Sequence, residues 1–350
     1  MSKDYSKIKN QKLKIAIVQY FIFIFLLLLL SVPAYAVDRP LDVPYTTQIP
    51  IGYWTNPWSN ACEESSITMV NQFYLGIKGK ISPATAKKLI SPLFTYEDKI
   101  FGENHDTNSY RTLRVIEDQT IFTGEIKQQP TLQEIKDHLK LGFPVISLHY
   151  GFDLPNKNLH FRSAGSSYHM MVISGFDNET ETFITNDPGD TITGYNHKYN
   201  YDDFLATLGD FDHTTKKVNK NKPRVILTYP KLVKSEADDK VYYLKNNKKY
   251  YISDPKIFAK NNWSWDWIKK VPNEWLGSLE NESDLTIDNY LPASPKLVIA
   301  SGKKSIYLIE NNTRYRISSP NTFKEHGWNW RDIEEVDYSW LQKIPKGEVL

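Results

Sequence analysis

The chain has 350 residues, a net charge of +2 from 43 basic and 41 acidic residues, and one cysteine. Charge that is nearly balanced and spread along the chain gives no electrostatic footprint for nucleic acid, so no nucleic-acid partner is expected. A single cysteine rules out an intramolecular disulfide, and packing must therefore stabilise the fold.

Residues 1–36 have the pattern of an export signal. Lysines precede an apolar run from Ile15 to Val32, and Ala34 and Ala36 suit a signal-peptidase site. The run has 18 residues, close to the ~20 that span a bilayer as a helix. A cleaved signal and an uncleaved anchor through residues 15–32 both stay open. In either case the pattern predicts a secreted or cell-envelope protein of bacterial type.

A helix is the first element expected after this signal. In "NACEESSITMVNQFYLG", Asn60 is the expected cap, Glu63 completes a capping box, and Gly76 is the stop. This helix would place Cys62, the only cysteine, in its first turn.

Further helices and then strands follow within residues 37–230. "SPATAKKLI" and "TLQEIKDHLKLG" have helix signals, the latter with a Thr131/Glu134 capping box. "PVISLHY", "YHMMVISGF" and "TFITN" are rich in branched and aromatic residues, which indicates β-strands. Helices followed by strands place this domain in the α+β class.

The tail differs in composition, and the polar segment 229–240 marks the expected boundary before it. Two stretches, beginning at Val241 and Ile306, agree at a constant offset of 65 positions. We expect two repeats, residues 231–285 and 286–350, each with a hairpin at an Asn-Asn pair, a short helix opening at Ser-x-Pro, and tryptophans in its core. The tail resembles the tyrosine- and tryptophan-rich repeats of bacterial surface proteins, which suggests a cell-envelope partner.

The position of Cys62 suits a nucleophile. Unpaired N–H groups and the positive end of the dipole at a helix start favour a thiolate. Glu63 and Glu64 oppose that effect on the thiol. A nucleophilic cysteine also needs a base.

His169 and Asp187 are the expected base and orienting carboxylate. A three-residue turn centred on Asn178 would set Asp187 directly opposite His169 on one face of a hairpin. Asp187 would then accept the Nδ1 proton of His169 and present Nε2 to the sulfur of Cys62. Gln48 and the backbone N–H of Cys62 are the expected oxyanion donors.

These residues resemble a known family. "VPYTTQ", "ACEESSITMV", "LKLGFPVISLHYG", "YHMMVISGFD" and "ITNDPG" look like the double-glycine, bacteriocin-processing peptidase-like group of papain-fold cysteine proteases. The resemblance covers residues 41–210 and implies Gln48 in the oxyanion hole with a Cys62, His169 and Asp187 triad. Many members have Cys-Gly-Pro at the nucleophile, where this chain has Cys62-Glu63-Glu64. The exporters of the family carry a transporter domain, and no phosphate-binding loop for one occurs here.

The sequence therefore predicts an exported cysteine peptidase that cleaves peptide or protein substrates through a thioester, with no cofactor and no metal. Two other functions stay open: a binding or adhesion protein that keeps the fold without turnover, and a transferase that uses the same thioester. His149 and His160 are expected to have plain surface roles. Trp54 and Trp58 either line the substrate site or cover the core.

Overall fold

The structure is a computed structural model that describes residues 40–159, 167–286, 296–310, 313–336 and 338–350. The expected export signal, residues 1–36, and His160 lie outside the described residues. Within the described ranges, no helix has both the length and the apolar character needed to cross a bilayer.

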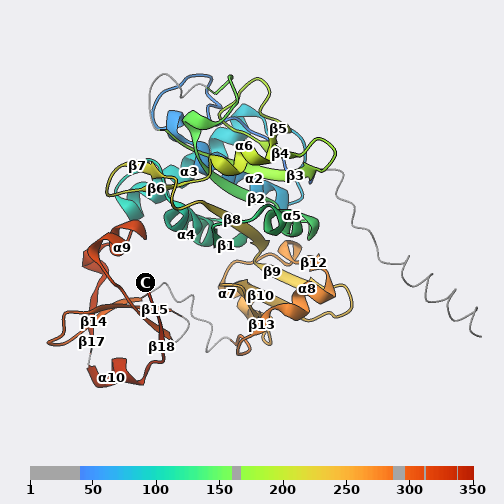
Figure 1. The fold of residues 1–350 in the computed structure, drawn as a ribbon. Coiled ribbons are helices and arrows are strands. Elements are labelled where there is room, and N and C mark those ends of the chain that lie inside the picture. Colours follow the sequence, from blue (N-terminus) through green and yellow to red (C-terminus); the bar gives the residue numbers. More distant parts are fainter. Residues whose placement is uncertain (1–39, 160–166, 287–295, 311–312, 337) are drawn as a thin grey trace, which may run out of the picture. The chain divides into compact units, whose positions relative to one another are not determined.

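Helices form the first part of the chain (Figure 1). The Thr131/Glu134 capping box is confirmed, because Thr131 accepts the N–H of Glu134 and Glu134 accepts the N–H of Thr131. Ser82 caps α3 as its sequence suggests, but this helix continues well beyond the predicted segment. The helices and 3₁₀ turns here are η1 Trp58–Asn60, α2 Cys62–Tyr74, α3 Pro83–Phe101, α4 Ser109–Gln119, α5 Leu132–Lys140, η2 Gly151–Asp153 and α6 Tyr201–Ala206.

A six-stranded sheet with the order β1-β8-β2-β3-β4-β5 is the centre of this part, and all of its neighbouring strands are antiparallel. The three predicted strands are its β2, β3 and β4, so the α+β class is confirmed. The strands are β1 Phe122–Gln128, β2 Val145–Tyr150, β3 Tyr168–Asp177, β4 Thr182–Asn186, β5 His197–Asn200 and β8 Arg224–Pro230, with a separate pair β6 Asp210–Asp212 and β7 Lys217–Asn219.

The predicted register of β3 and β4 is wrong. His169 pairs with His149 on β2, while β4 ends at Asn186 opposite Val172, so Asp187 comes just after the strand. Two features move the register. The side chain of Asp177 accepts the N–H groups of two loop residues and lengthens the turn, and an irregularity between Ile173 and Gly175 shifts the pairing again.

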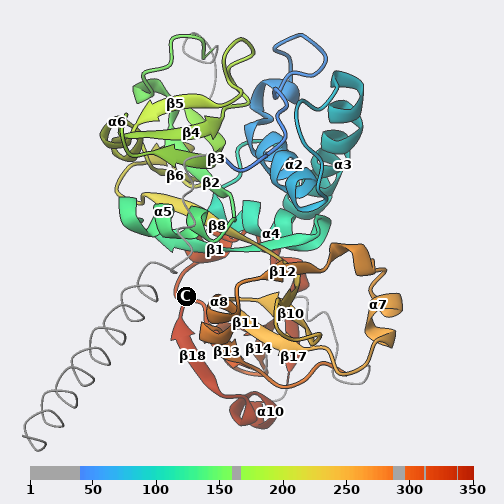
Figure 2. The same ribbon diagram turned by 90° about the vertical axis from the view of Figure 1, so that its right-hand side faces the viewer.

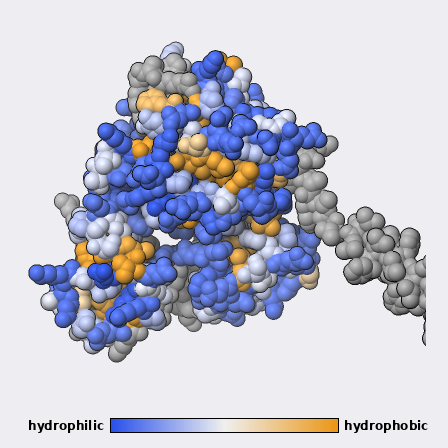
Figure 3. Space-filling model, viewed as in Figure 1, coloured by the Kyte–Doolittle hydropathy of each residue, from blue (hydrophilic) through white to orange (hydrophobic). Residues whose placement is uncertain are grey.

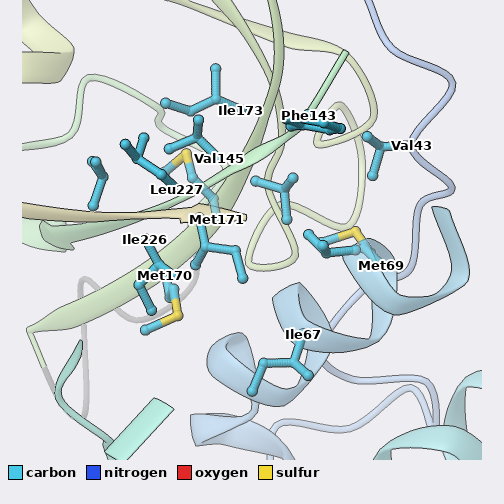
Figure 4. Close-up of a cluster of buried hydrophobic side chains, with 14 of the residues drawn as sticks. Val43, Ile67, Met69, Phe143, Val145, Met170, Met171, Ile173, Ile226 and Leu227 are labelled. Carbon is cyan, nitrogen blue, oxygen red and sulfur yellow. The ribbon is translucent and has the colours of Figure 1, made fainter. Parts of the chain in front are cut away.

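Helix α2 packs against β3 and α3 (Figure 2). Ile67 and Met69 of α2 lie in the same apolar cluster as Met170 and Met171 of β3 (Figure 4). Successive residues of a strand face opposite sides, and every residue of β3 up to Phe176 is buried, so both faces of the sheet are covered there. Burial stabilises each such apolar side chain by roughly 1.5–3 kcal/mol. This packing fixes the start of α2 against the strand that carries His169.

Two five-stranded sheets follow, with the orders β12-β9-β10-β11-β13 and β17-β14-β15-β16-β18. In both, the three central strands are antiparallel and the two outer strands pair in parallel. Their strands are β9 Leu232–Ser235, β10 Val241–Lys245, β11 Lys248–Tyr251, β12 Lys269–Val271, β13 Glu280–Asn281, β14 Lys296–Ala300, β15 Ile306–Glu310, β16 Thr313–Arg316, β17 Glu334–Val336 and β18 Lys346–Val349. Their helices and 3₁₀ turns are α7 Lys256–Lys260, η4 Trp265–Trp267, α8 Asn273–Ser278, α9 Pro320–Glu325, η5 Trp330–Asp332 and α10 Tyr338–Lys343.

The turn chemistry expected in the tail occurs in part. Asn246 and Asn247 both have positive φ between β10 and β11, as a tight hairpin requires; the second Asn-Asn pair lies outside the described residues. Ser319 caps α9, whereas α7 begins after Pro255 without a side-chain cap. The segment 229–240 contains the end of β8 and the whole of β9, so regular structure extends into the expected boundary.

The expectation that the tail tryptophans fill a core is wrong for two of them. Trp265 and Trp330 are 55% and 54% exposed. Trp265 stacks on Phe258 and Trp330 on Phe323, with ring centroids 3.8 and 4.1 Å apart. Each indole therefore covers a phenylalanine with one face and meets solvent with the rest. Apolar areas are otherwise scattered over a mostly hydrophilic surface on the face that Figure 3 shows.

Candidate active site

Cys62 is the first residue of α2. The predicted cap is wrong: Asn60 ends the preceding 3₁₀ turn, and Ala61 occupies the cap position without a side-chain hydrogen bond. The expected capping box is absent because the carboxylate of Glu63 accepts the N–H of Thr107, far along the chain, instead of the N–H of Asn60. The backbone N–H of Cys62 is thus one of the helix's first donors, which have no intrahelical acceptor.

His169 and Asp187 form a buried hydrogen-bonded pair despite the changed register. Nε2 of His169 lies 2.7 Å from Oδ1 of Asp187, and both side chains are at most 1% exposed. The sequence argument expected Nδ1 in this contact, so the roles of the two ring nitrogens are exchanged. Asp187 reaches the ring from the loop after β4, because leaving the strand frees its side chain from the alternation of the sheet.

Two groups that the sequence argument missed hold the Asp187 carboxylate. The hydroxyl of Tyr199 donates to Oδ2 at 2.6 Å, and the N–H of Gly189 donates to Oδ1 at 3.0 Å. Burial raises the pKa of Asp187, but the charge of His169 and these hydrogen bonds outweigh it and lower the pKa of Asp187 below its usual value. The carboxylate therefore stays ionised next to the imidazole.

Gly189 also defines the space available to the imidazole. A Cβ on this residue would lie 2.8 Å from Cε1 and 3.3 Å from Nε2 of His169. Real Cβ atoms essentially never come within 3.0 Å of another heavy atom, so the contact with Cε1 forces a shift. The glycine of "NDPGD" is readable in the sequence as a turn residue, but its contact with the ring is not.

The sulfur of Cys62 lies beside β3. The backbone of Met170, the residue after His169, hydrogen-bonds to it and favours the thiolate. Burial, followed by the charge and hydrogen bond of Glu63 and the charge of Asp106, acts in the opposite direction and raises the pKa of the thiol well above its usual value. Burial and the acidic neighbours thus outweigh the hydrogen bond from Met170, a balance that the sequence alone left open.

Gln48 is buried next to the start of α2. Its Nε2 donates to the carbonyl of Ser59 at 2.9 Å and faces the carbonyl of Trp58 at 3.4 Å. Its backbone N–H donates to the carbonyl of Pro188, which connects it to the loop of Asp187. Gln48 therefore contacts the 3₁₀ turn before α2 through its side chain and the loop of Asp187 through its backbone.

His149 is completely buried, so the expectation of a plain surface role is wrong. It pairs with His169 across β2 and β3. The hydroxyl of Thr207 donates its hydrogen bond to the carbonyl of Phe204. In its contact with Nδ1 of His149 at 2.8 Å it must therefore accept, so Nδ1 carries the proton and donates. Burial, and then the charge of His169, lower the pKa of His149 to about 3. His149 is therefore a neutral neighbour of the base.

A pocket of about 430 Å³ opens near the starts of α2 and β3. Asn60, two residues before Cys62, and Ser167, two residues before His169, both line it. Its other lining residues are His105, Asp106, Phe152, Phe211 and Lys216. The pocket therefore lies near the starts of α2 and β3, and Cys62, His169 and Asp187 are not among its lining residues.

Trp58 packs into the core and does not line this pocket. It is 7% exposed and meets Phe94 edge to face, and Trp54 packs against the same apolar cluster. Among the residues that the structure describes, no group of three or more histidine, cysteine, aspartate or glutamate side chains could hold a metal ion.

Comparisons with known proteins identify the family of the first part of the chain. Residues 40–217, half of the chain, match the family model described as "Peptidase_C39 like family". A solved structure described as a "putative C39-like peptidase from Bacillus anthracis" matches with 14% identity, a TM-score of 0.34 and coverage of 55% of this chain and 98% of that chain. No curated protein matches the chain.

Proposed function

Because the chain belongs to the Peptidase_C39-like family, we propose that it is a cysteine peptidase with Cys62 as nucleophile, His169 as base and Asp187 as orienter. One observation carries the assignment: the buried 2.7 Å bond from Asp187 to His169, which lies on the strand against which the helix of Cys62 packs. A base held by a carboxylate beside a thiol at a helix start is the arrangement that nucleophilic catalysis requires.

The ring contacts set the proton path. Nε2 of His169 is hydrogen-bonded to Asp187, so Nδ1 is the ring nitrogen that accepts the thiol proton. The thiolate attacks the peptide carbonyl carbon, and the carbonyl electron pair moves to oxygen. When the tetrahedral intermediate collapses, the C–N bond breaks and Nδ1–H gives its proton to the leaving amine. Water then attacks the thioester with His169 as base, which releases the acid and restores the thiol.

The proposed oxyanion donors are the N–H of Cys62 and Nε2 of Gln48. The first suits the task because a residue at the start of a helix has a backbone donor without an intrahelical acceptor. The second is directed at the carbonyls of Trp58 and Ser59. Gln48 must therefore release one of those bonds to reach an oxyanion. The pocket between Asn60 and Ser167 is the proposed site for a substrate side chain next to the scissile bond.

We further propose a papain-like arrangement, with the nucleophile on a helix and the base on an antiparallel sheet. The sheets over 232–281 and 296–349 are proposed to be two repeats that bind a cell-envelope component. Residues 1–36 are proposed to export the chain, and the apolar run 15–32 would anchor it to the membrane if it is not cleaved.

The test of the proposed function compares the full chain with Cys62→Ala on a mixture of unstructured peptides, with new termini identified by mass spectrometry. Ser66→Ala is the matched control, since it also removes one buried heteroatom from α2. New termini from the wild type and from Ser66→Ala, and none from a folded Cys62→Ala, are expected. Equal cleavage by Cys62→Ala would reject Cys62 as nucleophile. An added amine that appears in the products would indicate transfer instead of hydrolysis.

A further inference from the structure

The residue after the nucleophile has an unusual environment. Glu63 is 1% exposed, although it is the second residue of a helix and carries a carboxyl group. Its Oε1 accepts the N–H of Thr107 at 2.8 Å, and its Oε2 accepts the thiol proton of Cys62 at 3.0 Å. The carboxyl therefore bridges the loop before α4 and the sulfur.

This contact concerns the proton that catalysis must move. A thiol can give its proton to only one acceptor at a time, and here it points at Glu63. Attack by the sulfur needs that proton on His169 instead. Glu63 thus competes with the base for the proton of the nucleophile.

The surroundings of Glu63 favour its neutral form. Glu64 on α2, Glu97 on α3 and Asp106 before α4 are buried nearby, and Tyr168 on β3 also interacts electrostatically with it. Burial, followed by the charges of Glu64 and Asp106, raises the pKa of Glu63 well above its usual value. Burial is also the main cause that raises the pKa of Glu97 to about 8.

We propose that Glu63 is a positioning residue that controls the protonation of Cys62. As a carboxylate it accepts a hydrogen bond from the thiol, holds the proton on the sulfur and restrains attack. As a neutral acid it donates a hydrogen bond from its Oε2–H to the sulfur and stabilises the thiolate that forms when the thiol proton passes to His169. In both forms, the Oε1 of Glu63 accepts the hydrogen bond from the N–H of Thr107. The switch changes only where protons lie, and no covalent bond between heavy atoms forms or breaks. The effect of Glu63 on peptide hydrolysis rests on the proposed function. Its effect on the protonation and reactivity of Cys62 does not.

A rate that depends on the charge of Glu63 has a recognisable pH dependence. Glu63→Gln keeps an oxygen for the N–H of Thr107 and offers the sulfur a permanent N–H donor. At low pH, where Glu63 is already neutral, the variant and the wild type should behave alike. As the pH rises and Glu63 ionises, Cys62 of the wild type should react more slowly than Cys62 of Glu63→Gln. A purely structural role of Glu63 would change the rate by the same factor at every pH.

The experiment measures the rate of Cys62 alkylation by iodoacetamide from pH 5 to pH 9 in the full chain, in Glu63→Gln and in Glu64→Gln. The first variant should match the wild type within about twofold at pH 5 and exceed it about tenfold or more at pH 9, since one pKa unit is a tenfold change in thiolate. Glu64→Gln is the matched control: it removes a neighbouring charge that hinders the ionisation of Glu63, so it should leave the rate unchanged or lower it.

A constant ratio between Glu63→Gln and the wild type at all pH values would overturn the proposal, as would an equal gain in Glu64→Gln. If Glu63→Gln does not fold, the ultraviolet titration of thiolate in the wild type decides. Thiolate formation centred above the ~8.5 of a free thiol supports the proposal, and formation below that value overturns it.

The alkylation rate separates this proposal from the proposed function. Suppose that neither the wild type nor any variant hydrolyses peptides, but that the alkylation rate of Glu63→Gln relative to the wild type rises with pH. The peptidase assignment then fails and the control by Glu63 stands. If the wild type hydrolyses peptides through Cys62 and Glu63→Gln shows no gain, the peptidase assignment stands and the control by Glu63 fails.

Discussion

Replacing Gly189 by alanine tests whether the position of the His169 ring sets the reactivity of Cys62. The new Cβ would lie 2.8 Å from Cε1 of His169, whereas ordinary contacts begin at 3.4 Å, so the ring or the turn must give way by about 0.6 Å. The ring has little freedom, because its Nε2 is bound to Asp187 at 2.7 Å. A misplacement of about 1 Å can cost ~100-fold in rate, so we expect Gly189→Ala to lose roughly 10- to 100-fold.

The assay is the rate of Cys62 alkylation at neutral pH, together with peptide hydrolysis, in variants whose fold is checked by near-ultraviolet circular dichroism. Gly142→Ala is the control. Gly142 has a φ of +87° with open space around its Cβ position, so alanine there costs stability, about 1 kcal/mol, without touching the ring. A folded Gly189→Ala that is alkylated as fast as the wild type would refute the argument that this glycine sets the position of the base.

Three further predictions concern stability. Tyr199→Phe removes the 2.6 Å hydrogen bond to the buried Asp187 carboxylate and should cost about 1.5–3 kcal/mol in urea unfolding at pH 7; an unchanged midpoint would mean that this bond contributes nothing. Asp210→Ala leaves the buried guanidinium of Arg224, now paired at 2.6 Å, without its carboxylate partner and should cost about 3–5 kcal/mol. The double variant with Arg224→Leu should recover part of that loss, and a full additive loss would contradict the pairing. Burial lowers the pKa of His149 to about 3, so between that value and ~6.5 the unfolded chain binds a proton at His149 and the folded chain does not. The free energy of unfolding should therefore fall as the pH drops below ~6.5, by about 2 kcal/mol at pH 5. His149→Asn keeps a donor for Thr207 and should show a shallower fall in the urea midpoint between pH 7 and pH 5; an equal fall would remove His149 as its cause.

Local signals in the sequence predicted much of the framework. The capping box of Thr131 and Glu134 acts over three residues, and the branched and aromatic runs of β2, β3 and β4 act over each strand. Such signals survive folding because the groups that interact are already close along the chain. They also sufficed to place Cys62 at the start of a helix.

The tertiary structure decided the details of the site. The irregularity after Ile173 and the longer turn moved Asp187 out of register, yet the loop brought its carboxylate back to His169 through the other ring nitrogen. Hairpin geometry alone cannot predict this, because one added residue in a strand reverses every side chain that follows.

The sequence by itself determined the local positions of the candidate residues: a thiol at a helix start, a histidine on a strand, and an aspartate that the next segment of the chain brings to that histidine. Only the tertiary structure decided their protonation, through partners that are distant along the chain. Thr107 meets Glu63 across 44 positions, and Tyr199 on β5 meets Asp187 in the loop after β4. The cost of burying a charge depends on such partners, and so does the reactivity of Cys62.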